Sequence, residues 1–152
     1  MTWKLTDKWE QPRLRPDGNN ASFVEQFGNG VTREWIDEGW LVVHKVVLDD
    51  KGEAIEAWET MLRDTLDLWP SDVEYRGLDY FPNLSPLRFS SEVQDRFISL
   101  AFAAGNIRGR AAVVLPRTFV TMATRIFFNT TLKHYQPYIQ RRIFVRTQSG
   151  LL

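Results

Sequence analysis

The sequence predicts a single α/β domain built on one mixed sheet of about five strands, and three observations support this fold class. Segments rich in apolar and β-branched residues alternate with segments whose apolar residues recur at helical spacing, a pattern typical of strands linked by helices. The length of 152 residues suits one domain, and no repeat or linker divides the chain. A composition of 43% hydrophobic and 25% charged residues is that of a packed domain.

The first 30 residues differ from the rest. Residues 1–30 are predicted to form an irregular N-terminal arm, because prolines, glycines and asparagines occur there too often for a long helix or strand. Trp3 and Trp9 are costly to leave in water, so we expect the arm to pack on the core or on a second chain. The α/β domain is expected to cover residues 31–152.

The domain is predicted to begin with two strands and a helix. Residues 32–36 and 40–48 have the composition of strands, and the short turn between them contains a glycine. The apolar spacing then predicts a helix over residues 51–68, which stops before a proline. Asp50 is the expected N-cap of this helix, and Glu53 stands at the position that completes a capping box.

A third strand and a second helix follow. Residues 73–80 are predicted as the strand, and the apolar loop after it is interrupted by two prolines. Ser91 and Gln94 form another capping box, which predicts the start of the helix, and Gly105 predicts its end.

The C-terminal third completes a predicted order of β-β-α-β-α-β-α-β. Residues 111–115 are an uninterrupted apolar run, the form expected of a strand buried on both faces. Residues 119–130 have helical apolar spacing, and residues 142–146 are predicted as the last strand, with charged ends. The following residues are expected to pack in one core cluster: Trp58, Phe97, Val113 and Ile126.

Zero net charge hides an uneven distribution of charge. Residues 1–105 hold all 19 acidic residues and 11 of the 19 basic ones, whereas residues 106–152 hold eight basic residues and no acid. Mutual neutralisation within one fold, association of two copies through acid-to-base contacts, and phosphate or nucleic-acid binding are the three interpretations. Because the whole chain is neutral, nucleic acid is not an expected partner.

Several classes of protein are excluded by absent residues and motifs. The chain has no cysteine, which removes disulfide frameworks, thiolate metal sites and cysteine nucleophiles. It contains no dinucleotide-binding, Walker A, nucleophile-elbow or zinc-protease motif, so no cofactor is predicted. Charged residues in the first ten positions leave no secretory signal and no apolar run could span a membrane, so a cytoplasmic location is expected.

Three residues could carry chemistry. His44 interrupts an apolar strand, and a structural histidine that is hydrogen-bonded in or beside the core is favoured over a catalytic base. His134 is expected in a surface loop. Asp79 stands at the end of a predicted strand, where ligands often bind in α/β sheets, although a turn-capping role is the more common one.

Together the element order and three local segments resemble the SpoIIAA-like, STAS/SEC14-type domains of bacteria. These segments are Tyr75-Arg76-Gly77-Leu78-Asp79, the serine pair in Phe89-Ser90-Ser91-Glu92, and the run from Gly109 to Pro116 that leads on to Arg142-Ile143-Phe144. The resemblance covers residues 31–152 and implies a STAS-like fold.

The resemblance also implies a regulatory role for the serine pair. In anti-sigma-factor antagonists of this kind a partner kinase phosphorylates a serine in an Asp-Ser-Ser/Thr-Gly motif. Here Phe89 replaces the aspartate and Glu92 replaces the glycine, so Ser90 and Ser91 also fit plain helix capping.

Our first functional hypothesis is a non-enzymatic protein-interaction module, regulatory in the manner of such antagonists, that forms a homodimer and docks to an unidentified protein. The residues that could form its partner or ligand surface are Asp79, Arg117, Arg125, Arg141 and Arg142, the last two at the charged end of the last strand.

Two alternatives remain open. The first is a SEC14-like carrier of a small lipophilic or anionic ligand, in which Arg117 or Arg125 would meet a head group. Eight residues could line its pocket, although ordinary core packing is favoured for them: Phe81, Leu84, Leu87, Phe89, Phe127, Phe128, Tyr135 and Tyr138. The second alternative is an uncharacterised enzyme that uses Asp79 and His44.

Overall fold

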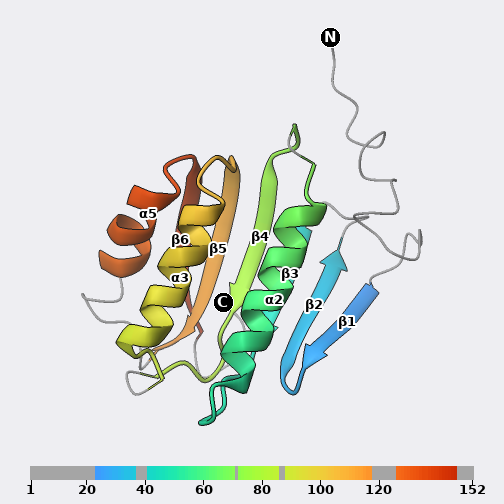
Figure 1. Cartoon of the computed structure of the whole chain (residues 1–152), viewed down its shortest axis with the longest axis vertical. Helices are drawn as coiled ribbons and strands as arrows, with labels where there is room; N and C mark the ends of the chain where they lie inside the picture. The colour runs from blue at the N-terminus through green and yellow to red at the C-terminus, as the bar shows by residue number, and fades with distance from the viewer. Residues whose placement is uncertain (1–22, 37–40, 71, 86–87, 118–125, 147–152) are drawn as a thin grey trace.

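The computed structural model contains a six-stranded mixed sheet with helices packed on one of its faces (Figure 1). The structure describes residues 23–36, 41–70, 72–85, 88–117 and 126–146. Neighbouring strands in the sheet are also neighbours along the chain, in the order β1-β2-β3-β4-β5-β6. The strands are β1 Phe23–Gly28, β2 Val31–Ile36, β3 Leu41–Val46, β4 Tyr75–Tyr80, β5 Gly109–Pro116 and β6 Ile139–Arg146.

The pairing changes from antiparallel to parallel at β3. Strands β1, β2 and β3 form an antiparallel meander, whereas β3, β4, β5 and β6 run parallel. Each parallel step moves one strand in the same direction, so right-handed crossovers place all of their connecting helices on the same face. These elements are α2 Glu53–Leu68, α3 Ser91–Ala103, the π-helical turn η3 Phe127–Thr131 and α5 Leu132–Tyr135 (Figure 1).

The mixed α/β class is confirmed, but the sheet has six strands because the expected arm contains one of them. Residues 23–28 form β1, so the prediction of an irregular segment up to residue 30 was wrong for this part. Gly30 has a φ of 82°, which lets the chain turn directly from β1 into β2. A Cβ atom on Gly28 would lie 2.8 Å from the Cβ of Ala57, so this glycine allows β1 to approach α2 closely. The turn-forming residues therefore end a strand here; residues 1–22 lie outside the described ranges.

Both predicted helix caps are displaced, by two residues at α2 and by one residue at α3. Gly52, not Asp50, is the N-cap of α2, and the side chain of Asp49 accepts a hydrogen bond from the Ala54 amide at 3.3 Å. Ser90, not Ser91, caps α3, where its hydroxyl accepts a hydrogen bond from the Val93 amide at 3.3 Å. Capping is therefore confirmed for Ser90, one residue before the predicted cap.

The predicted third helix differs most from the structure. Residues 118–125 lie outside the described part of the chain, and the turn after them is π-helical rather than α-helical. A π turn holds one more residue than an α turn, so the inward face differs in part from the one that α-helical spacing predicts. Phe127 is buried, as its helical spacing predicts, and Phe128 is buried beside it. Ile126 is 52% exposed, so its predicted burial was wrong.

The core lies between the sheet and the helices. Trp58, Phe97 and Val113 are buried in one cluster, as predicted. The rings of Trp58 and Phe97 lie 4.4 Å apart between their centroids, which ties α2 to α3. A second, smaller cluster surrounds Trp35 and Trp69 at the other end of the sheet. The candidate site lies within this layer.

Candidate functional site

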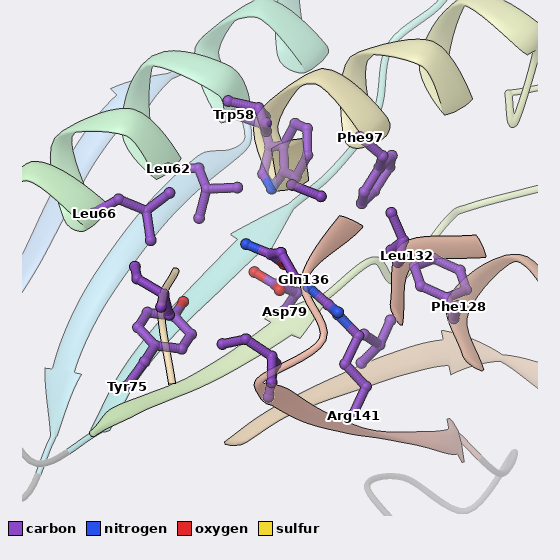
Figure 2. Close-up of a pocket in the computed structure, with 16 residues that line it drawn as sticks. Trp58, Leu62, Leu66, Tyr75, Asp79, Phe97, Phe128, Leu132, Gln136 and Arg141 are labelled. Carbon is purple, nitrogen blue, oxygen red and sulfur yellow. The ribbon is translucent and has the colours of Figure 1, made fainter. Parts of the chain in front are cut away.

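A cavity of about 50 Å³ lies between the sheet and the helices, and polar side chains line part of it (Figure 2). Asp79 and Tyr75 come from β4, Arg141 comes from β6, and Gln136 follows α5. The apolar walls come mainly from α2, α3, α5 and neighbouring strands, through the following residues: Trp58, Leu62, Leu66, Phe97, Leu100, Ala101, Ile107, Ala111, Val113, Phe128, Leu132 and Ile139. The cavity therefore has polar side chains on one side and apolar side chains on the others.

Strand alternation brings the polar side chains to one face. Tyr75 and Asp79 are four positions apart on β4, so strand alternation points both side chains toward the helices. Arg141 pairs with Ala111, and Ala111 pairs with Gly77, in one row across β6, β5 and β4. A Cβ atom on Gly77 would collide with the ring of Tyr75, so the glycine leaves the space that this ring occupies.

Asp79 is held in place by a buried histidine. His44 stands opposite Asp79 in the parallel register of β3 and β4, and its Nδ1 lies 2.9 Å from Asp79 Oδ1. The other ring nitrogen, Nε2, lies 2.9 Å from Thr65 Oγ1 on α2. His44 is fully buried, whereas Asp79 is 17% exposed and lines the cavity. His44 therefore positions the Asp79 carboxylate from the side away from the cavity, and its own ring does not line the cavity.

Arg141 is the cationic group of the site. Its Nη2 donates a hydrogen bond to Gln136 Oε1, and Gln136 Nε2 in turn donates to the Ala104 carbonyl at 3.3 Å. The other terminal nitrogen of the guanidinium, Nη1, is buried and has no hydrogen-bond acceptor within the described ranges. Loss of hydration on burial lowers the pKa of Arg141, and the negative charge of Asp79 opposes that shift.

Two further groups contribute polar atoms. The indole Nε1 of Trp58 is buried without a hydrogen-bond acceptor in the described part of the chain, and Figure 2 shows it turned toward the space in front of Asp79 and Gln136. Burial raises the pKa of the Tyr75 hydroxyl well above its ordinary value, and the charge of Asp79 adds to this shift. Tyr75 is therefore a neutral phenol in the folded protein at ordinary pH.

The predicted site residues are divided among several places. Asp79 lines the cavity, and the expectation that His44 is hydrogen-bonded inside the domain is confirmed. Arg141 was expected at an exposed strand end, but it alternates with Ile139 and Ile143 on the covered face and points inward. Arg142 points to the opposite face and is exposed.

The remaining predicted residues do not join the cavity. Arg117 is exposed, and Arg125 lies outside the described residues. Ser90 and Ser91 are exposed at the N-terminus of α3, and neither is among the residues that line the cavity.

The aromatic pocket proposed for a carrier is mostly core. Five of its eight residues are buried members of the main hydrophobic cluster, and one of the five, Phe128, also lines the cavity. Tyr135 packs against the cluster, Tyr138 is 52% exposed beneath Arg108, and Leu87 lies outside the described ranges.

Sequence reasoning missed four residues of the site environment: Trp58 as a donor, Thr65, Tyr75 and Gln136. The signal for Tyr75 was available, because it stands two residues before Gly77 and four before Asp79 on one strand. The signal for Thr65 was its position on the apolar stripe of α2, where a hydroxyl needs a partner. Gln136 follows α5, and nothing local to its sequence marks it.

Comparisons with protein-family models, with curated protein sequences and with solved structures found no match, so function is inferred from the chemistry of the site. Among the residues that the structure describes, no group of three or more His, Cys, Asp or Glu side chains could hold a metal ion. Within the same ranges, no helix has the length and apolar character that crossing a membrane requires.

Proposed function

We propose that this domain binds a small uncharged molecule in the cavity, through a carbonyl group that stands next to an N–H group, as in a primary amide. One observation carries this proposal: two buried N–H donors, Trp58 Nε1 and Arg141 Nη1, border one cavity and have no acceptor among the residues that the structure describes. A buried polar group without a hydrogen-bond partner costs about 1–3 kcal/mol of stability, so such groups are rare unless a ligand or a water supplies the partner.

The hydrogen-bonding capacity of the site defines the polar end of the ligand. Trp58 and Arg141 offer donors to a carbonyl oxygen. Asp79 has one side-chain hydrogen-bond partner within the described residues, His44, so its carboxylate retains acceptor sites for an N–H group. Since Asp79 would repel a second carboxylate, an uncharged amide fits better than an acid anion.

The cavity volume limits the rest of the ligand. A volume of about 50 Å³ has space for roughly three or four waters, and typical sites for larger organic ligands measure roughly 300–1,000 Å³. This size favours a short ligand over a lipid tail. The contact between His44 and Asp79 supports a positioning role for the histidine, because the ring does not line the cavity.

The test is a titration followed by the Trp58 indole signal in ¹H–¹⁵N spectra, assigned with Trp58→Phe. The probes are propionamide, propionate and 1-propanol, which share a size and differ in the polar end. We expect propionamide to give a saturable shift with a dissociation constant of about 1–10 mM, well within the affinity that a ligand of this size can reach. Propionate and 1-propanol should bind at least about tenfold more weakly, a difference of roughly 1.4 kcal/mol.

Two variants separate the cavity from the surface. Arg141→Met should abolish the propionamide shift, whereas Arg142→Ala, one residue away on the opposite face, should leave it unchanged. Equal binding of propionamide and 1-propanol, or an unchanged shift in Arg141→Met, would contradict the proposal.

A further inference from the structure

The second face of the sheet has no helix against it among the described elements, all of which lie on the other side (Figure 1). Strand alternation assigns this open face every second residue of β3 to β6. The open face is defined by the following residues: Leu41, Val43, Lys45, Arg76, Leu78, Tyr80, Arg110, Ala112, Val114, Pro116, Gln140, Arg142, Phe144 and Arg146. Basic, aromatic and small side chains therefore share one surface.

Among the described strands, the open face carries four arginines on β4 to β6 and one acid, Glu34, on the adjoining strand β2. Seven of the eight basic residues after position 105 are described, and none of them forms an ion pair with an acid in the described part of the chain. Exposed acids concentrate on α2 and α3, as with Glu53, Glu56 and Asp95. The charges are thus not neutralised locally, and the zero net charge of the chain does not describe the field over the open face.

A groove on the open face combines cations with an aromatic ring. Arg110, Arg142 and Phe144 line a hollow of about 460 Å³, whose floor includes Gly77 and Ala112. Arg110 and Arg142 are exposed, and Phe144 is 37% exposed. The small floor residues leave room for a flat group to lie beside the phenylalanine ring.

The aromatic and basic residues continue across the sheet. Tyr80, Val114 and Phe144 stand in one row across β4, β5 and β6. The guanidinium of Arg146 lies 5.7 Å from the centre of the Tyr80 ring and donates a hydrogen bond to its hydroxyl. Two aromatic rings therefore lie on this face, on either side of the buried Val114, and Arg146 covers the ring of Tyr80.

We infer that the open face binds single-stranded nucleic acid, with phosphates at Arg110 and Arg142 and a base stacked on Phe144. Exposed aromatic rings on a sheet, flanked by arginines, suit unpaired bases, because every base has a π face and every nucleotide a phosphate. A second copy of this chain fits less well, since most of its described exposed acids lie on the helix side and a face-to-helix contact would extend into an open filament. A duplex hides its bases and offers nothing for Phe144 to stack on.

The experiment measures fluorescence anisotropy of labelled 12-nucleotide oligo(U) and oligo(dT) with the full chain, over a range of salt concentrations. Phe144→Ala should weaken binding at least about fivefold, the lower end of the range for one base stacked on an aromatic ring. Arg142→Ala should weaken binding and should reduce the slope of log K against log salt by about 0.7, as expected for one phosphate contact to a single strand.

Arg63→Ala is the matched control, because it removes the same charge from a 58% exposed side chain on α2. It should leave both affinity and salt slope unchanged. Thermal melts of each variant show whether the fold is intact. The inference is overturned if the wild type does not bind either oligonucleotide. It is also overturned if Phe144→Ala binds as the wild type does, or if a duplex or a phosphatidylserine vesicle binds as tightly as the single strand.

Discussion

Arg33 and Arg141 lie in the same layer between the sheet and the helices, but their surroundings differ. Arg33 donates to both carboxylate oxygens of Glu25, at 2.7 and 2.8 Å, and its Nη1 reaches Asp64 at 2.7 Å and Thr65 at 3.0 Å. Among the described residues, Arg141 donates to Gln136 alone and leaves Nη1 buried without an acceptor. The first arginine is satisfied by its own chain, whereas the second faces a cavity.

This difference separates a structural role from a binding role. The Arg33 network joins β1, β2 and α2, so its acceptors hold the hairpin against the helix. At the Arg141 site, N–H donors that border a cavity lack acceptors among the described residues. In natural structures a ligand or a water usually accepts hydrogen bonds from such donors. Four predictions test this contrast, from the largest effect to the smallest.

The core that both regions share is tested by Phe97→Ala. Phe97 is buried against Trp58, Phe81 and both phenylalanines of η3, so its removal leaves a cavity in addition to the lost transfer free energy. We expect the free energy of unfolding to fall by about 3–5 kcal/mol, measured by denaturant titration. A midpoint equal to that of the wild type would mean that α3 does not pack on the sheet as described.

The structural role of Arg33 is tested by Arg33→Leu. This change leaves Glu25, whose side chain is 19% exposed, without its bidentate partner in a buried place. We expect the free energy of unfolding to fall by about 3 kcal/mol, because an uncompensated buried charge remains. Arg33→Lys should recover only part of the loss, since an ammonium cannot donate in parallel to both carboxylate oxygens. A loss below about 1 kcal/mol would place Arg33 among ordinary surface ion pairs.

The contrast also shows how far the sequence could go. The strands and helices between residues 31 and 116 follow from apolar spacing, and so does the burial of Phe97 and Val113. The sequence analysis missed β1 because its flanking residues favour turns. Pairing with β2 and packing on α2, which are not local signals, stabilise this strand. Ile126 was misplaced because a π turn, which depends on tertiary packing, changes the helical phase.

The candidate site was harder to predict than the fold. Asp79 and His44 were both noted as candidates, but their contact depends on the parallel register of β3 and β4, which no local pattern defines. Arg141 was assigned to the surface by its charge, although its alternation with Ile139 and Ile143 indicates the covered face. The sequence prediction for Arg141 therefore relied on its charge, although the alternation of apolar residues along β6 indicated its correct face.

The neutral phenol in the cavity is tested by alkaline pH. Because the pKa of Tyr75 is higher in the folded than in the unfolded chain, the folded state retains a proton that the unfolded state releases above about pH 10. The free energy of unfolding should therefore fall as the pH rises through this range, by up to about 1.4 kcal/mol per pH unit for this group. Tyr75→Phe should flatten this decline, whereas Tyr138→Phe, at a 52% exposed position, should not. Identical pH profiles for the two variants would contradict the buried phenol.

The binding role of Arg141 is tested by the effect of Arg141→Met on the free energy of unfolding, which we expect to be small. Arg141→Met removes a buried donor that has no acceptor and replaces it with an apolar chain of similar length, while Gln136 loses one partner. These effects oppose each other, so we expect the free energy of unfolding to change by no more than about 1 kcal/mol, against the larger loss at Arg33. Denaturant titration of the ligand-free protein measures this change, and the propionamide titration measures the function in the same variant. A loss as large as that of Arg33→Leu would make Arg141 a structural residue, because the folded chain would then depend on its charge even with the cavity empty of ligand.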